Sequence, residues 1–179
     1  SQFMENFCWQ RPVLDMIAGH HETGEPLPEA MFQRMLAAKN FQSAMMIVRQ
    51  LEFALFDLRI HREYQPGQEG QVAHIMHEVR EQVAVVKPPE WQRFAHSFSH
   101  IFAGGYAAGY YSYLWAEVLS ADAFSLFEEQ GIFDQATGLA FLHNILEQGC
   151  AKDAAELFRD FRGRDPQIDA LLRHSGIAA

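Results

Sequence analysis

The sequence contains only two cysteines in 179 residues, Cys8 and Cys150, and they lie far apart. Two thiols exclude a scaffold held by several disulfides and are typical of a protein that folds in a reducing cytosol. Basic residues are scarce as well, since 14 lysines and arginines face 23 acidic residues and leave a net charge of −9. No basic stripe stands out, which argues against a nucleic-acid partner.

Long apolar runs are also missing, so no segment of the sequence reaches membrane-spanning length. No stretch alternates convincingly with a period of two, which argues against a sheet. Hydrophobic residues nevertheless make up 49% of the chain and aromatic residues 13%, which is enough to bury one core. We therefore predict a cytoplasmic all-α protein, with residues 1–179 forming a single domain and with no membrane partner.

Apolar residues recur at helical spacing along most of the chain. The predicted helical segments are 2–20, 28–39, a long helix capped by Asn40 and ending near 62, 69–86, the tyrosine stretch up to about 129, 139–147, 153–162 and 166–174. The long helix carries two apolar stripes, which predicts burial on two sides. Residues 83–86 fit either the end of a helix or an extended segment.

Hydrogen-bonding side chains concentrate in residues 96–115, which contain two histidines, three glycines and four tyrosines. Tyr106, Tyr110 and Tyr113 follow a spacing of i, i+4 and i+7, so in a helix they would share one face, with Tyr111 pointing elsewhere. Phenols are neutral near pH 7 and donate hydrogen bonds, which suits them to an oxyanion. The alternative is a packing role, with each hydroxyl satisfied inside the core.

Two consecutive glycines, Gly104 and Gly105, precede the first of these tyrosines. Paired glycines relax the steric limits on the backbone, so residues 100–106 are predicted to form a loop. Such a loop can approach a ligand closely, or it can swing Tyr106 toward a bound peptide.

Other polar clusters contain the residue types that bind metals. They are the helix face His74, His77, Glu78 and Glu81, the run His20, His21 and Glu22, the pair His96 and His100, and the single carboxylate Glu5. Neither His-Glu pair is followed by a histidine three residues on, so neither completes a His-Glu-x-x-His motif. Solvated helix faces and helix ends explain the first two clusters, and we assign no metal ligand in this chain.

The run from His100 to Trp115, His-Ile-Phe-Ala-Gly-Gly-Tyr-Ala-Ala-Gly-Tyr-Tyr-Ser-Tyr-Leu-Trp, resembles the C-terminal signature of the thimet oligopeptidase family of zinc metallopeptidases. Further motifs agree with that family and occur in its order. They are Ser-Gln-Phe-Met-Glu-Asn-Phe-Cys-Trp at 1–9, His-Glu-Thr-Gly-Glu-Pro-Leu-Pro at 21–28, Ala-Lys-Asn-Phe-Gln at 38–42, Arg-Gln-Leu-Glu-Phe-Ala-Leu-Phe-Asp at 49–57 and Phe-Arg-Gly-Arg-Asp-Pro at 161–166.

The resemblance implies an all-α endopeptidase that uses zinc to hydrolyse short peptides. Family members carry a zinc-binding His-Glu-x-x-His helix and, further on, a third ligand in a Glu-x-Pro-Ser-Gln run. This chain opens at the Ser-Gln of that run, so the zinc ligands are expected ahead of Ser1. We therefore expect the C-terminal piece of a larger peptidase, with zinc in the full-length enzyme and none in this piece. Its partner would be the N-terminal part of the same polypeptide, and alone it would be inactive. Glu5 then either supports that metal indirectly or is an ordinary exposed carboxylate.

The resemblance also assigns roles within the tyrosine stretch. Tyr106 and Tyr113 match family tyrosines that bind the tetrahedral oxyanion and the nearby substrate backbone, and His100 matches a histidine that contacts substrate. Tyr110 is a weaker candidate for peptide contact. The predicted catalytic residues are Tyr106, Tyr113 and His100, and the predicted substrate-binding residues are His100, Gly104, Gly105, Tyr106, Tyr110 and Tyr113.

Two further hypotheses remain open from the sequence. The chain can act as a helical interaction module, and apolar surface exposed by truncation would then favour a dimer. It can also be a non-catalytic paralogue that lacks the zinc helix.

Overall fold

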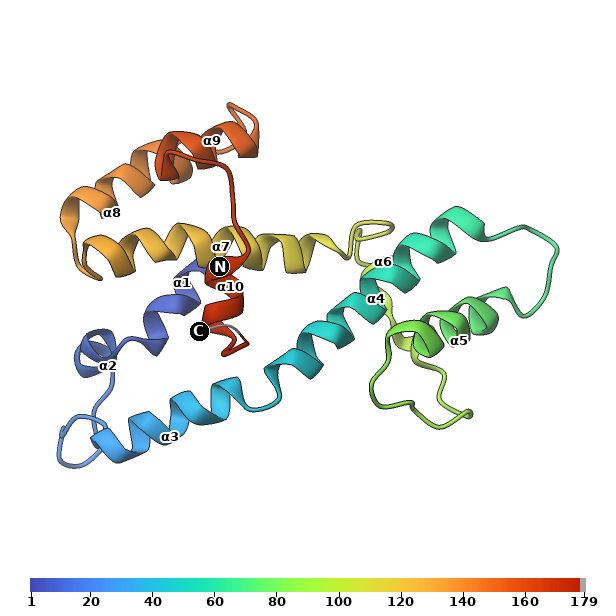
Figure 1. The fold of residues 1–179 in the computed structure, drawn as a ribbon, viewed down its shortest axis with the longest axis horizontal. Helices are drawn as coiled ribbons and strands as arrows, with labels where there is room; N and C mark the ends of the chain where they lie inside the picture. Colours follow the sequence, from blue (N-terminus) through green and yellow to red (C-terminus); the bar gives the residue numbers. More distant parts are fainter. Residues whose placement is uncertain (178–179) are drawn as a thin grey trace. The chain divides into compact units, whose positions relative to one another are not determined.

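The computed structural model describes residues 1–177 and is helical, with no strand among those residues. All-α architecture, predicted from the sequence, is therefore confirmed. The chain packs as two compact units, one formed by Ser1–Phe41 together with the chain from Ala116 onward and one by Gln42–Trp115. Figure 1 follows the helices along the chain. The single domain inferred from the sequence stays a prediction.

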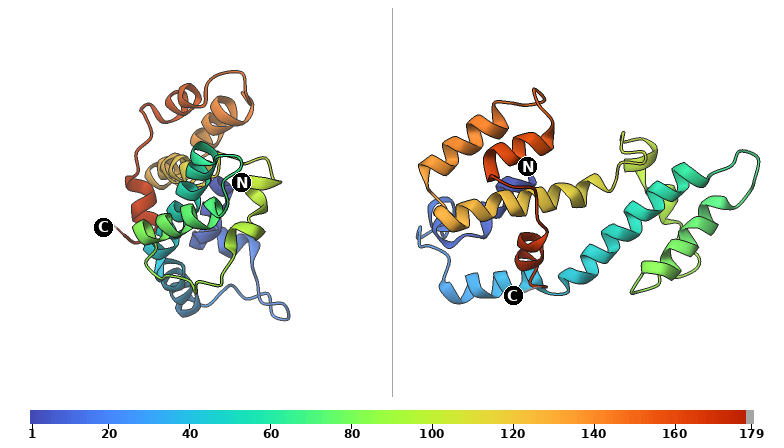
Figure 2. Two further views of the ribbon diagram at one scale, coloured as in Figure 1. Left: turned by 90° about the vertical axis from the view of Figure 1, so that its right-hand side faces the viewer. Right: turned by 45° about the horizontal axis from the view of Figure 1, so that its top comes forward.

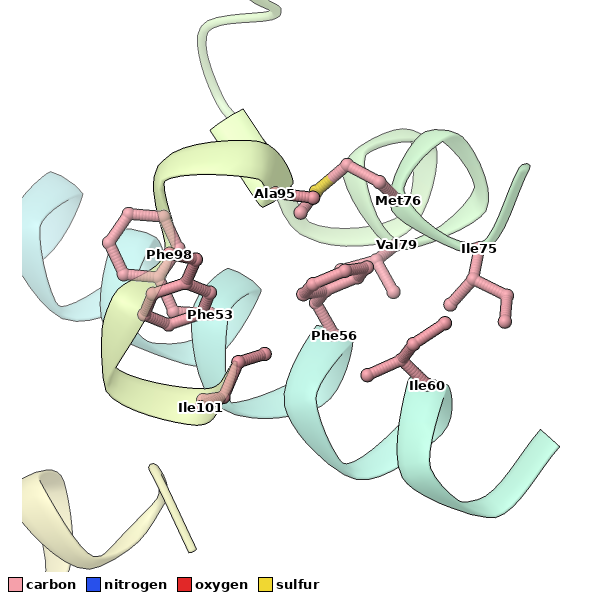
Figure 3. Packing of buried hydrophobic residues seen from close by; sticks show 9 residues of the cluster. All are labelled: Phe53, Phe56, Ile60, Ile75, Met76, Val79, Ala95, Phe98 and Ile101. Carbon is pink, nitrogen blue, oxygen red and sulfur yellow. The ribbon is translucent and has the colours of Figure 1, made fainter. Parts of the chain in front are cut away.

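The Gln42–Trp115 unit is built on two helices that pack side by side, α4 (Ser43–Glu63) and α5 (Gln71–Val83) (Figure 1). A short 3-10 helix (Phe94–Ser97) and α6 (Ser99–Phe102) follow, and α7 (Ser112–Gln130) begins at the end of this unit. Buried side chains of α4, α5 and residues 95–101 meet in one core, shown in Figure 3, which contains Phe53, Phe56, Ile60, Ile75, Met76, Val79, Ala95, Phe98 and Ile101.

The core explains which face of α4 is inward. Phe53, Phe56 and Ile60 recur at helical spacing and are each at most 7% exposed. The other apolar stripe of the long helix, Ala44, Val48, Leu51, Leu55 and Leu58, was predicted to be buried as well, but Leu51 and Leu58 each keep 43% exposure. That prediction is wrong for this chain because the core of this unit gathers on the face that carries Phe53, Phe56 and Ile60.

The other unit contains the N-terminal helices and the last third of the chain (Figure 2). Its elements are α1 (Gln2–Glu5), a 3-10 helix (Asn6–Trp9), α2 (Arg11–Ile17), α3 (Glu29–Asn40), the remainder of α7, α8 (Gln135–Phe141), a π-helical turn (Leu142–Leu146), α9 (Ala154–Arg162) and α10 (Asp169–His174). Phenylalanines dominate the core, with Phe124 and Phe127 of α7 packed against Phe158 and Phe161 of α9.

Several helix boundaries differ from the predictions. The segment 2–20 is interrupted because Gln10 is extended, with φ −99° and ψ 127°, just before Pro12. Asn40 is not the cap of the long helix; it ends α3, and Gln42 with φ 54° is the capping residue of α4. After α5 ends at Val83, Ala84 is extended, which settles the open reading of residues 83–86.

No helix among the described residues is both long and apolar enough to cross a membrane.

Candidate active site

Four rings from the tyrosine stretch gather in the Gln42–Trp115 unit. We call His100, Tyr106, Tyr110 and Tyr113 the ring cluster. The Tyr113 ring lies 5.0 Å from that of Tyr106 and 5.1 Å from that of Tyr110, between centroids. The His100 ring stands edge-on to Tyr110 at 5.8 Å and to Tyr113 at 6.1 Å, and it lies 6.4 Å from Tyr106. The structure thus brings the four predicted aromatic site residues together.

The way the chain assembles this cluster differs from the prediction. Tyr106 and Tyr110 are not on a helix, because residues 103–111 form successive turns and α7 begins only at Ser112. His100, expected in a loop, lies in the short helix α6. A backbone hydrogen bond from the Tyr106 N–H to the His100 carbonyl, 3.0 Å long, closes the turn between them. The prediction of a shared helix face is therefore wrong. The structure nevertheless brings the three phenol rings together.

The loop predicted for residues 100–106 is present only from residue 103 onward, because residues 100–102 belong to α6. Gly104 and Gly105 are each required in it for a different steric reason. A Cβ on Gly104 would lie 2.9 Å from the carbonyl oxygen of His100 and 3.0 Å from its Cα, which is closer than backbone atoms allow. Gly105 has φ +81°, a conformation that side chains rarely adopt. The turn between His100 and Tyr106 therefore depends on both glycines.

This packing leads to a prediction for Gly104→Ala in the longer peptidase that the resemblance implies. The new methyl group has to push the His100 backbone away, which displaces the histidine and Tyr106 together. We expect kcat to fall by about tenfold or more, since small misplacements near a reacting centre are costly.

Gly109→Ala is the matched control in the same loop. Its Cβ would meet its nearest atom, the Tyr106 carbonyl oxygen, at an ordinary 3.5 Å. In steady-state measurements of peptide hydrolysis, kcat of Gly109→Ala should lie within about twofold of the wild-type value. Equal rates for both alanine variants would show that the turn geometry is not needed.

The hydroxyl groups of the three tyrosines are held differently. Tyr110 is partly buried and donates to the side-chain oxygen of Gln50 at 3.1 Å, and burial raises the pKa of its phenol. Tyr113 and Tyr106 share a hydrogen bond, which together with burial raises the pKa of Tyr113 above its ordinary value. A phenol is already protonated at neutral pH because its ordinary pKa lies near 10, and the raised pKa of Tyr113 leaves it in this form, which can donate to an anion.

Exposure separates these tyrosines further. Tyr106 is 39% exposed and His100 is also exposed, so both can be reached from solvent. Tyr111 is 51% exposed and is absent from the ring cluster, as its position outside the i, i+4, i+7 pattern suggested. Tyr106 and Tyr113 thus form a paired-phenol surface beside an exposed imidazole, whereas the Tyr110 hydroxyl is already directed at Gln50.

A buried carboxylate that the sequence analysis did not single out lies beneath this loop. Asp57 of α4 has no exposed surface, and its two oxygens accept the backbone N–H groups of Ala108 at 2.9 Å and Tyr110 at 2.8 Å. The sequence does contain a pattern that indicates burial of Asp57, because this residue lies on the same i, i+3, i+4, i+7 stripe as Phe53, Phe56 and Ile60. A charged residue on a buried stripe needs buried partners.

Comparison with known proteins decides the family. Residues 1–177 match the family model described as peptidase family M3. The chain belongs to peptidase family M3. The resemblance given by its separated motifs is therefore confirmed over almost the whole chain.

Individual M3 relatives agree with this assignment. Oligopeptidase A of Salmonella typhimurium is 60% identical over 99% of this chain, which is 26% of that protein. Probable cytosolic oligopeptidase A of Arabidopsis thaliana is 49% identical over 100% of this chain and 26% of its own length. Dipeptidyl carboxypeptidase of Escherichia coli is 34% identical, again over 99% of this chain and 26% of that protein. The chain thus spans about a quarter of the length of these M3 peptidases.

The helix face of α5 is occupied by ion pairs in this M3 chain. Glu78 accepts from Arg59 at 2.6 Å and lies 3.2 Å from His74, and Glu81 pairs with Lys87 at 2.5 Å. Such ion pairs are common on solvated helix faces.

Among residues 1–177, His20, His21 and Glu22 form the one group whose three possible ligand atoms lie within 4.8 Å of one another. All three are exposed, and the Nδ1 atom of His20 accepts the backbone N–H groups of Glu22 and Thr23 at 3.3 Å. A neutral imidazole that accepts at Nδ1 carries its proton on Nε2, so neither nitrogen is then open to a metal. This group does not fit a peptidase zinc centre.

The last of the metal-site candidates, the carboxylate of Glu5, lies in the unit formed by Ser1–Phe41 and the chain from Ala116 onward. Glu5 is exposed, and together with burial its charge raises the pKa of Glu117. Both residues line a cavity of about 180 Å³ that also contains Lys39 and His174. The geometry identifies Glu5 as an exposed carboxylate beside a second one, and its support of a metal stays a hypothesis.

Proposed function

We propose that this chain is the C-terminal part of a zinc-dependent oligopeptidase and supplies the wall of the cleft that binds short peptides. The observation that carries the proposal is the ring cluster, in which the Tyr106 and Tyr113 hydroxyls share a hydrogen bond beside the exposed His100. Membership of a peptidase family gives that arrangement its chemical context.

The proposed task of the tyrosines is to stabilise negative charge. Attack on a peptide carbonyl turns its oxygen into an oxyanion, and phenol hydroxyls placed beforehand bind that oxyanion more strongly than the neutral carbonyl. Tyr113 is suited to this task because a phenol is protonated at neutral pH and can donate a hydrogen bond to the oxyanion. Tyr106 adds a second donor, and His100 binds the peptide alongside. Tyr110 and the glycine turn shape the surface against which the peptide lies.

The zinc belongs to the complete enzyme in this proposal. Its chemistry is to activate a water molecule for attack on the peptide bond. The family resemblance places the zinc ligands in another part of the longer polypeptide, and the proposal adopts that placement. No step assigned to the present residues depends on their binding the metal.

Location and partners follow from the same proposal. A cytoplasmic enzyme agrees with the two cysteines, both exposed and unpaired as thiols. The proposed partners are short peptide substrates and the preceding part of the same polypeptide, and neither a nucleic acid nor a membrane is among them. The exposed stripe of α4, with Leu51 and Leu58, favours a second possibility, that the isolated chain dimerises as a helical module.

Intact mass, zinc content and cleavage of quenched-fluorescent peptides test the proposal together. We expect the 179-residue chain to show neither bound zinc nor peptide cleavage, and the polypeptide extended by its upstream region to show about one zinc per chain and cleavage. An extended polypeptide that binds zinc without cutting peptides would contradict the proposal. A dimer that persists in the extended polypeptide would favour the interaction module.

A further inference from the structure

We propose that Asp57 is a positioning residue, whose buried carboxylate holds the turn of residues 106–110 and thereby orients the ring cluster for peptide hydrolysis. The inference rests on the proposed function, because it concerns the same tyrosines. The carboxylate of Asp57 reaches the turn through the backbone N–H groups of Ala108 and Tyr110.

Both oxygens of the Asp57 carboxylate accept hydrogen bonds from the backbone of the turn. Oδ1 accepts the N–H of Ala108 at 2.9 Å, and Oδ2 accepts the N–H of Tyr110 at 2.8 Å. A third group, Nδ1 of His61, lies 3.0 Å from Oδ1 and 2.8 Å from the Asp57 carbonyl. An ionised carboxylate in a buried position accepts such bonds more strongly than a neutral oxygen does.

The turn needs such an anchor because its backbone is unusual. Ala108 has φ 52°, a left-handed conformation that residues with a side chain seldom adopt. Strained backbone of this kind persists where the surroundings fix it, and it concentrates at functional sites. The bond from Asp57 to the Ala108 N–H acts on the strained residue itself.

The anchored residues are close to the cluster in the chain. Tyr110 is bound directly at its N–H, Tyr106 lies two residues before Ala108, and Tyr113 lies three residues after Tyr110. The Tyr110 N–H bond, together with the bond from its hydroxyl to Gln50, ties this residue to α4 at both ends. Because the rings of Tyr106 and Tyr110 both touch Tyr113, a shift of the turn moves the proposed oxyanion donors.

Asp57→Asn in the complete enzyme tests this role with little change in shape. The amide keeps one oxygen but points an NH₂ group at the other backbone N–H, so two donors face each other. We expect kcat to fall by about ten- to a hundredfold with KM changed by less than about threefold. Hydrogen exchange of the peptide covering residues 103–111 should accelerate.

Glu52→Gln is the matched control, because it makes the same chemical change in a buried carboxylate of the same helix. Glu52 is 7% exposed, and its carboxylate binds Arg80 of α5 at 2.9 Å. We expect it to lower the unfolding midpoint while kcat and exchange at residues 103–111 stay at wild-type values. A purely structural role for Asp57 would make the two variants alike, with kcat unchanged in both, and would overturn the inference.

Tyr113→Phe separates this inference from the proposed function. If Tyr113→Phe loses activity and Asp57→Asn keeps kcat within threefold, the positioning role is overturned and the proposed function stands. If Tyr113→Phe is fully active, the oxyanion role itself fails, and the positioning role fails with it. Should Asp57→Asn not fold, His61→Gln decides the question: a kcat several-fold lower supports the role, and an unchanged kcat overturns it.

Discussion

Replacing Tyr113 by phenylalanine should lower kcat of the complete enzyme by about a hundred- to a thousandfold. The substitution removes one hydroxyl from the phenol pair and leaves the ring that packs 5.0 Å from Tyr106 and 5.1 Å from Tyr110. The lost donor acts mainly on the transition state, so KM should change much less than kcat. Initial rates with a quenched-fluorescent peptide at several concentrations give both constants.

Tyr111→Phe is the control for this experiment. This variant removes the equivalent hydroxyl from Tyr111, two residues before Tyr113. The Tyr111 side chain is 51% exposed and lies outside the ring cluster. We expect its kcat to remain within about twofold of wild type. A loss below about threefold for Tyr113→Phe would remove Tyr113 from the proposed catalytic residues.

Replacing Asp122 by asparagine should destabilise the chain by about 3 kcal/mol. Asp122 is 1% exposed on α7 and accepts two bonds from Arg164, at 2.5 and 2.6 Å, as well as the Gln167 N–H at 2.7 Å. The asparagine removes the negative charge and leaves these donors without their carboxylate. Urea unfolding of the 179-residue chain, followed by circular dichroism, measures the change.

The same carboxylate predicts a dependence on pH. Burial alone would raise the pKa of Asp122, but the bonds from Arg164 and from the Gln167 N–H outweigh it, so the folded pKa lies below the ordinary value. A group with a lowered folded pKa stabilises the protein above its unfolded pKa, near 3.9 for aspartate. The stability difference between wild type and Asp122→Asn should therefore be constant near neutral pH and shrink as the pH falls below about 4.

Asp160→Asn is the control for Asp122, because it breaks an exposed pair with Lys152. Exposed pairs contribute little, so its unfolding curve should nearly match that of wild type at every pH. A difference between wild type and Asp122→Asn that stayed constant down to pH 2 would contradict the assigned role of the Asp122 charge.

The composition of the ring cluster could be predicted from the sequence, but its construction could not. Three phenols at i, i+4 and i+7 suggested a helix face, yet Tyr106 and Tyr110 lie in turns before α7 begins at Ser112. Local spacing cannot show that a distant carboxylate competes for the backbone N–H groups of residues 108 and 110. Asp57, 51 and 53 residues away, accepts those two bonds.

The sequence by itself determined the helical class, most helix positions, the family and the group of residues that form the candidate site. It did so because helical periodicity, proline and glycine positions, and motif order are local properties of the chain. Only the tertiary structure decided that Asp57 and Asp122 are buried and bonded, and that one stripe of α4 stays exposed. Those outcomes depend on which surfaces meet after folding, and a residue's distant partners are not encoded in its neighbours along the chain.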